Sequence, residues 1–171
     1  MAIPLRVPRL LPASGTTGVV LAIDYGRSRL GLALSDEAGV TARPFAVWTR
    51  TNRRRDLARL RELVRQQKVR RIVIGLPLHL GGTPSEMSEE AIRFSERLEK
   101  ALGIPVELMD ERLSSWEAKQ TISAGASRKR GGRGTSGRGA ASRSAPLDDI
   151  AAAIILRDFL DRERLRAGSR D

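Results

Sequence analysis

The sequence contains no cysteine and only one histidine, His79, among its 171 residues. The absence of cysteine excludes a disulfide framework, a zinc site built on thiolates and a cysteine nucleophile. A single histidine also excludes a site built on several imidazoles. Any metal ion that the chain binds must therefore be a hard cation held by oxygen ligands.

The sequence also lacks a long apolar run, since no stretch approaches the ~20 residues needed to cross a bilayer. Three prolines and two arginines within residues 1–18 interrupt the apolar core that a signal peptide would need. We therefore predict a cytoplasmic protein without membrane contact. Its expected organisation is a disordered leader at 1–18, one domain at 19–162 and a tail at 163–171.

Basic residues are in excess, with 31 Lys and Arg against 20 Asp and Glu and a net charge of +11. This balance indicates a polyanionic partner, although arginine richness can also follow from genome composition. The basic residues are concentrated at 50–71 and, without any acid, at 125–145, whereas residues 84–120 are net acidic. Such polarity is expected of a protein that docks one face on phosphates.

The hydrophobic pattern changes period along the chain. Alternating or uninterrupted apolar runs predict five strands, at residues 19–23, 30–35, 45–49, 71–76 and 104–109. The first three are close enough for an antiparallel meander, and Leu30, Leu32 and Leu34 predict a second strand covered on one face. The run at 71–76 is typical of a parallel strand buried on both faces.

Capping patterns and helical spacing predict four helices. The first follows Thr51 or Asn52; the second is opened by Thr83, Pro84 and Glu86 and ended by Gly103; the third runs from Ser114 to about Ala124; the fourth covers 147–160. Residues 125–145, rich in glycine, serine and arginine, predict a flexible basic loop. The expected fold is α/β, a mixed five-stranded sheet with helices on both faces.

Three acids occupy positions where a site is expected. Asp24 ends the first buried strand, Glu111 follows the last strand, and Asp148 opens the final helix. Sites in open α/β sheets form outside the carboxyl ends of the strands, so these three carboxylates are expected to converge. Asp110 and Asp149 are the second choices for the last two positions.

Carboxylates held close together repel one another, and Mg²⁺ or Mn²⁺ relieves that repulsion. Two such ions about 4 Å apart can activate a water and stabilise the leaving oxygen of a phosphodiester. Each acid also has a simpler interpretation: Asp24 as a turn residue, Glu111 as an ion-pair partner of Arg112, and Asp148 as a helix cap.

Four blocks resemble the signatures of the YqgF family, a Holliday-junction-resolvase-like family also described as pre-16S ribosomal RNA nucleases. In order they are AIDYGRSRLGLALSD, IVIGLPLHLGGT, MDERLSS and LDDIAAAIIL, within about residues 19–160. The resemblance implies a ribonuclease H-like fold, divalent-metal nuclease chemistry and a role in ribosomal RNA maturation. It places the family's three acids on Asp24, Glu111 and Asp148.

The expected substrate is a structured nucleic acid, bound by a monomer or homodimer. Candidate phosphate-binding residues are Arg27, Arg29, Arg53, Arg54, Arg55, Arg112, Arg128, Lys129, Arg130 and Arg133. The sequence leaves three alternatives open: a four-way DNA junction resolvase, a non-catalytic nucleic-acid-binding module, and an ATP-binding phosphotransferase.

Overall fold

A computed structural model describes residues 18–76, 85–110 and 147–168, excluding the side chains of residues 147–149. The predicted leader at 1–18 therefore lies almost entirely outside the described residues. The helix from Ser114 and the loop at 125–145 lie wholly outside them. None of the described helices is long and apolar enough to span a membrane.

Five strands form one mixed sheet in the order β3-β2-β1-β4-β5. The strands are β1 (Val19–Tyr25), β2 (Arg29–Ser35), β3 (Ala42–Thr49), β4 (Val69–Leu76) and β5 (Val106–Asp110). The first three form an antiparallel meander, and β4 and β5 run parallel to β1. The predicted mixed five-stranded sheet is confirmed.

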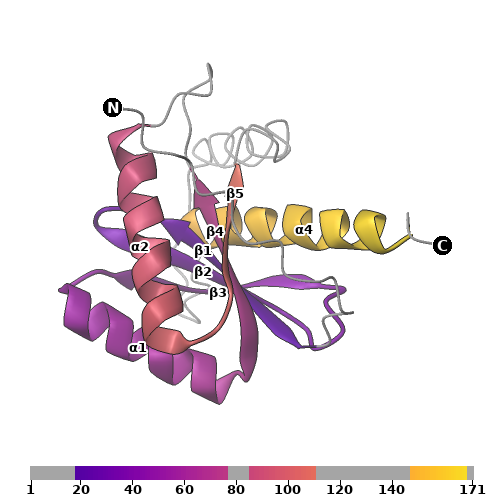
Figure 1. Ribbon diagram of the computed structural model, residues 1–171, viewed down its shortest axis with the longest axis horizontal. Coiled ribbons are helices and arrows are strands. Elements are labelled where there is room, and N and C mark those ends of the chain that lie inside the picture. Colours follow the sequence, from indigo (N-terminus) through magenta and orange to yellow (C-terminus); the bar gives the residue numbers. More distant parts are fainter. Residues whose placement is uncertain (1–17, 77–84, 111–146, 169–171) are drawn as a thin grey trace, which may run out of the picture.

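Three described helices cover the two faces of this sheet, as Figure 1 shows. They are α1 (Arg53–Gln66), α2 (Glu86–Leu102) and α4 (Leu147–Gly168). Leu21 and Ile23 of β1 point to one face and pack with side chains of α1 and α2. Val20 and Ala22 point to the other face and pack under α4. The alternation of β1 thus supplies two separate cores.

The prediction that only one face of β2 is covered was wrong. Leu30, Leu32 and Leu34 lie in the core beneath α1 and α2, while Ala33 on the opposite face is fully buried under α4. On this second face β2 carries the small residues Gly31, Ala33 and Ser35. An alternation of large and small apolar residues therefore marked two covered faces.

Two helix boundaries also differ from the prediction. Ser85, rather than Thr83, is the N-cap of α2, and its hydroxyl and that of Ser88 form the capping box instead of Glu86. The last helix continues to Gly168, eight residues beyond Leu160, so residues 163–168 are helical. By contrast, Asn52 is confirmed as the cap of α1 and Gly103 as the left-handed end of α2.

Candidate active site at the carboxyl edge of the sheet

Asp24 occupies the carboxyl end of β1, next to the last residue of the strand. Because Val20 and Ala22 face α4, the alternation of the strand points the half-buried Asp24 side chain toward the same face. Tyr25 points the opposite way and packs against Phe94 of α2, with 5.0 Å between ring centroids. The chain then turns at Gly26.

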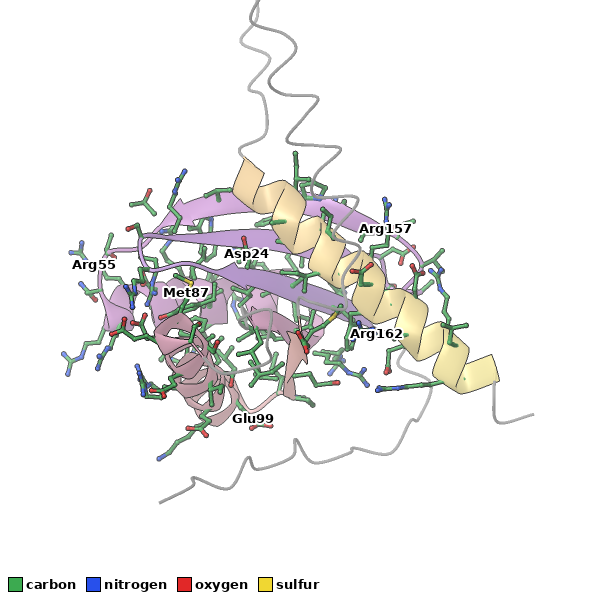
Figure 2. The ribbon with its side chains drawn as sticks, turned by 90° about the horizontal axis from the view of Figure 1, so that it is seen from above. Asp24, Arg55, Met87, Glu99, Arg157 and Arg162 are labelled. Carbon is green, nitrogen blue, oxygen red and sulfur yellow. The ribbon has the colours of Figure 1, made fainter. Side chains whose placement is uncertain are left out.

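The direction of α4 brings its first turn toward Asp24. Arg164, near the end of α4, donates to the backbone carbonyl of Val40 at 2.5 Å, in the turn between β2 and β3. That turn lies at the edge where β1 begins, since the amide of Gly18 donates to Glu37 at 2.8 Å. The N-terminus of α4 therefore points to the opposite, carboxyl edge, and in Figure 2 Asp24 lies nearer to that end than Arg162 does.

Asp148 and Asp149 are the second and third residues of α4 and so belong to this first turn. Their side chains lie outside the described part of the structure. The backbone places both residues in the turn of α4 that points to the carboxyl edge and does not distinguish between them, so the choice of Asp148 over Asp149 stays a prediction.

Asp110, the second choice on β5, falls on the other face of the sheet. Met109 packs under α4, whereas Asp110 is aligned in register with Leu76, which packs on the α1 and α2 side. Asp110 therefore points away from the face that carries Asp24. Glu111, the first choice, lies outside the described residues.

Within residues 18–76, 85–110 and 147–168, no three carboxylates or histidines group closely enough to hold a metal ion. Two of the three predicted ligands are not represented there by their side chains. The assignment of Asp24, Glu111 and Asp148 to a metal site accordingly remains a prediction.

Beneath the turn after Asp24 lies an ion pair that the sequence analysis missed. Arg50 donates from Nε to Asp56 Oδ2 at 3.3 Å and from Nη1 to the carbonyl of Gly26 at 2.9 Å. Its guanidinium also lies 4.8 Å from the centroid of the Tyr25 ring. The signal was an acid in the first turn of a helix otherwise opened by arginines, six residues after Arg50.

The predicted phosphate-binding arginines fall into distinct groups. Arg27 pairs with Glu86 at 2.7 Å and Glu90 at 3.0 Å, and these hydrogen bonds raise the pKa of its guanidinium. Arg29 is exposed at the start of β2, and three exposed arginines form the first turn of α1, namely Arg53, Arg54 and Arg55. The remaining candidates lie outside the described residues: Arg112, Arg128, Lys129, Arg130 and Arg133.

The ten basic residues at 50–71 are therefore not one uniform phosphate-binding surface. Arg50 is paired with Asp56, and Arg71 is buried between Glu107 and Glu163. Arg59 stacks on the Trp48 ring at 4.2 Å, and Arg65 pairs with Glu62 at 2.6 Å. The exposed arginines at the start of α1 remain the strongest candidates of this segment, because they lie at the carboxyl edge.

Comparison with known families places this fold and edge in context. The model of the family described as "RuvX: Holliday junction resolvase" matches residues 18–162. The chain belongs to the RuvX family. This agrees with the resemblance carried by the four sequence blocks.

Two proteins that are similar to this chain in sequence carry the name "Putative pre-16S rRNA nuclease". The protein from Anaeromyxobacter dehalogenans is 44% identical over 142 residues, which cover 83% of this chain and 96% of the relative. The protein from Koribacter versatilis is 39% identical over 151 residues, covering 87% of this chain and 90% of the relative.

Among solved structures, RuvC of T. thermophilus in complex with a Holliday junction substrate is similar with a TM-score of 0.51. The match covers 88% of this RuvX-family chain and 96% of RuvC, at 16% sequence identity. At that identity the likeness concerns the fold, and it confirms the predicted ribonuclease H-like class.

Proposed function

We propose that this RuvX-family chain is a divalent-metal-dependent nuclease that hydrolyses phosphodiester bonds of precursor 16S ribosomal RNA in the cytoplasm. The observation that carries the proposal is the placement of Asp24 at the carboxyl edge, on the face toward which the first turn of α4 points. The names of the relatives support the RNA substrate.

In this proposal Asp24, Glu111 and Asp148 hold Mg²⁺ or Mn²⁺. The donor set fits such a cation, because Asp24 supplies a half-buried carboxylate and α4 carries two further acids in its first turn. On β5, Met109 faces α4 and Asp110 faces away, which argues against Asp110 as a partner of Asp24. The bound cation would lower the pKa of a water and offset charge on the phosphate.

The chain's own residues have two further tasks in this scheme. The backbone of the Asp24 turn is held by Arg50, so that the carboxylate keeps a fixed direction at the edge. The exposed Arg29, Arg53, Arg54 and Arg55 lie on the elements that meet this edge and would bind phosphates on either side of the scissile bond.

Cleavage of four-way DNA junctions is the second candidate function, favoured by the description of the matching family. Phosphate contacts serve either nucleic acid equally, whereas the 2′-hydroxyl distinguishes RNA from DNA. The decision therefore depends on direct comparison of substrates.

A Mg²⁺-dependent cleavage panel tests the proposal. Purified protein is incubated with precursor 16S RNA ends, four-way DNA junctions, and single strands of each nucleic acid, with Asp24→Asn as the control. We expect specific cleavage of precursor RNA that requires the metal and is absent in Asp24→Asn. Faster cleavage of junctions than of RNA would favour the second function, and no metal-dependent cleavage of any substrate would refute the proposal.

A further inference from the structure

A cleft of about 580 Å³ opens between α1, α2 and the turn that joins β1 to β2. Five arginines line it, one of them (Arg50) from the segment between β3 and α1: Arg27, Arg50, Arg53, Arg93 and Arg97. Only two acids, Asp56 and Glu90, share the lining. The lining therefore carries a net positive charge, although α2 belongs to the part of the sequence that is net acidic.

The arginines of the cleft differ in how far their charge is already compensated. Arg27 and Arg50 are engaged with Glu86, Glu90 and Asp56, and Arg93 lies 3.4 Å from the exposed Glu89. Arg53 and Arg97 are exposed and form no ion pair within the described residues. These two arginines, on facing helices, are available to an anionic ligand.

The floor of the cleft does not offer a stacking surface for bases. Tyr25 and Phe94 lie there, but both residues are buried. The Arg50 guanidinium covers both rings, at 4.8 Å from the Tyr25 centroid and 5.7 Å from the Phe94 centroid. Recognition by this surface would therefore rest on charge and hydrogen bonding, which suits phosphates better than bases.

The cleft lies at the same sheet edge as Asp24 but on the opposite face. Tyr25, which lines the cleft, follows Asp24 directly, and successive residues of a strand point to opposite faces. Gly26 turns the chain between them, and its carbonyl is held by Arg50 at 2.9 Å. A nucleic-acid strand that crosses the β1–β2 turn would pass from the face with the cleft to the face with Asp24.

The cleft is also long enough for more than one phosphate. Its α2 lining runs from Glu90 to Leu98, eight residues or roughly 12 Å along the helix. At ~3.4 Å per nucleotide this length spans about three phosphates of a helical strand.

We propose that this arginine-lined cleft binds the sugar–phosphate backbone of the RNA strand whose scissile phosphate lies at the Asp24 edge. The proposal rests on the nuclease function proposed above and identifies how the substrate is held outside the reacting group. Arg53 and Arg97 are its two principal phosphate contacts, and α2 contributes to substrate binding through its basic face.

The test measures binding without cleavage. Single-stranded RNA affinity is determined by fluorescence anisotropy across a salt series, in an Asp24→Asn background, with and without Arg53→Ala and Arg97→Ala together. We expect a several-fold loss of affinity and a log–log salt slope that is shallower by about 1.4, since each lost phosphate contact contributes about 0.7 on single strands. Both arginines are exposed, so the melting temperature should not change.

Arg43→Ala with Arg157→Ala is the matched control. These residues are also exposed, and the pair removes the same charge from the opposite end of the molecule, beside the β2–β3 turn. Equal losses in the two double variants would overturn the proposal, because they would reduce the effect to net charge. Unchanged affinity and slope in Arg53→Ala with Arg97→Ala would overturn it as well.

Two further readouts separate the possible failures. Free ATP is titrated as a competitor, and its displacement of RNA from the parent but not from the Arg53 and Arg97 variant would make the cleft a nucleotide site instead. If no substrate is cleaved by the wild-type chain, yet RNA binding depends on Arg53 and Arg97 as expected, the nuclease function fails while the cleft remains an RNA-binding site.

Discussion

Arg50 and Asp56 form an ion pair beneath the turn that follows Asp24, with 3.3 Å between Arg50 Nε and Asp56 Oδ2. Asp56 is buried and also accepts from the backbone amide of Thr51 at 3.1 Å. The pair therefore ties the first turn of α1 to Arg50, the residue that follows β3. Arg50 also donates to the carbonyl of Gly26, and this hydrogen bond holds the turn that follows Asp24.

Asp56→Ala should lower the free energy of unfolding by about 3 kcal/mol, because it leaves the Arg50 guanidinium and the Thr51 amide without their acceptor. Urea denaturation of wild type and variant measures this. Arg65→Ala is the control, since it breaks the exposed and solvent-screened Glu62–Arg65 pair and should lower the free energy of unfolding far less than Asp56→Ala does. Equal costs would contradict a special role for Asp56.

Glu107 provides a pH-dependent prediction. Its burial raises the pKa of its carboxyl, against the opposing charge of Arg71. The folded state therefore holds this proton more tightly than the unfolded chain, and the stabilisation that results is lost as pH rises through the folded-state pKa. Glu107→Gln removes this contribution. Its stability relative to wild type should increase as pH rises across the acid range.

Asp36→Asn should give the opposite slope. Hydrogen bonds from the amides of Val40 and Thr41 lower the pKa of Asp36, so its contribution is lost as pH falls. Relative to wild type, this variant should become less stable as pH rises. Thermal melts of both variants over the same pH series check the two signs, and parallel slopes would contradict the electrostatic assignment.

The sheet and its covering helices could be predicted from the sequence because the spacing of apolar residues indicates which side chains of each element are buried. The alternation in β1 and the continuous run in β4 are local signals that survive without tertiary information. The predicted N-cap of α2 was two residues too early, because Thr83, Pro84 and Ser85 each suit the start of a helix. Local preference alone does not choose among them.

The Arg50–Asp56 pair was not predictable in the same way. A charge count treats all arginines as available to phosphate, although Arg50 and Arg71 are engaged within the fold. Likewise, the cleft brings together Arg53 of α1 and Arg97 of α2, which are 44 positions apart in the sequence. Arg53 belongs to a basic segment, whereas Arg97 belongs to a segment that is net acidic. Only the packing of the two helices reveals that surface.

The choice between neighbouring acids is open to direct measurement. Glu111→Gln should reduce the cleavage rate more than Asp110→Asn, because Asp110 lies on the face away from Asp24. Asp148→Asn should likewise reduce the cleavage rate more than Asp149→Asn does, as the family resemblance implies. Single-turnover rates of the four variants test both assignments, and a larger loss at Asp110 or Asp149 would reverse the corresponding one.

The most direct test compares wild type and Asp24→Asn on precursor 16S RNA, with Mg²⁺ titrated and thermal melting recorded alongside. Cleavage by wild type should rise with Mg²⁺, and the variant should lose at least about a hundredfold in rate, since the metal-dependent chemistry needs this carboxylate. Its melting temperature should not fall, because Asp24 lies at a strand end rather than in the core. A folded Asp24→Asn protein that cleaves at the wild-type rate would contradict a metal site at the carboxyl edge.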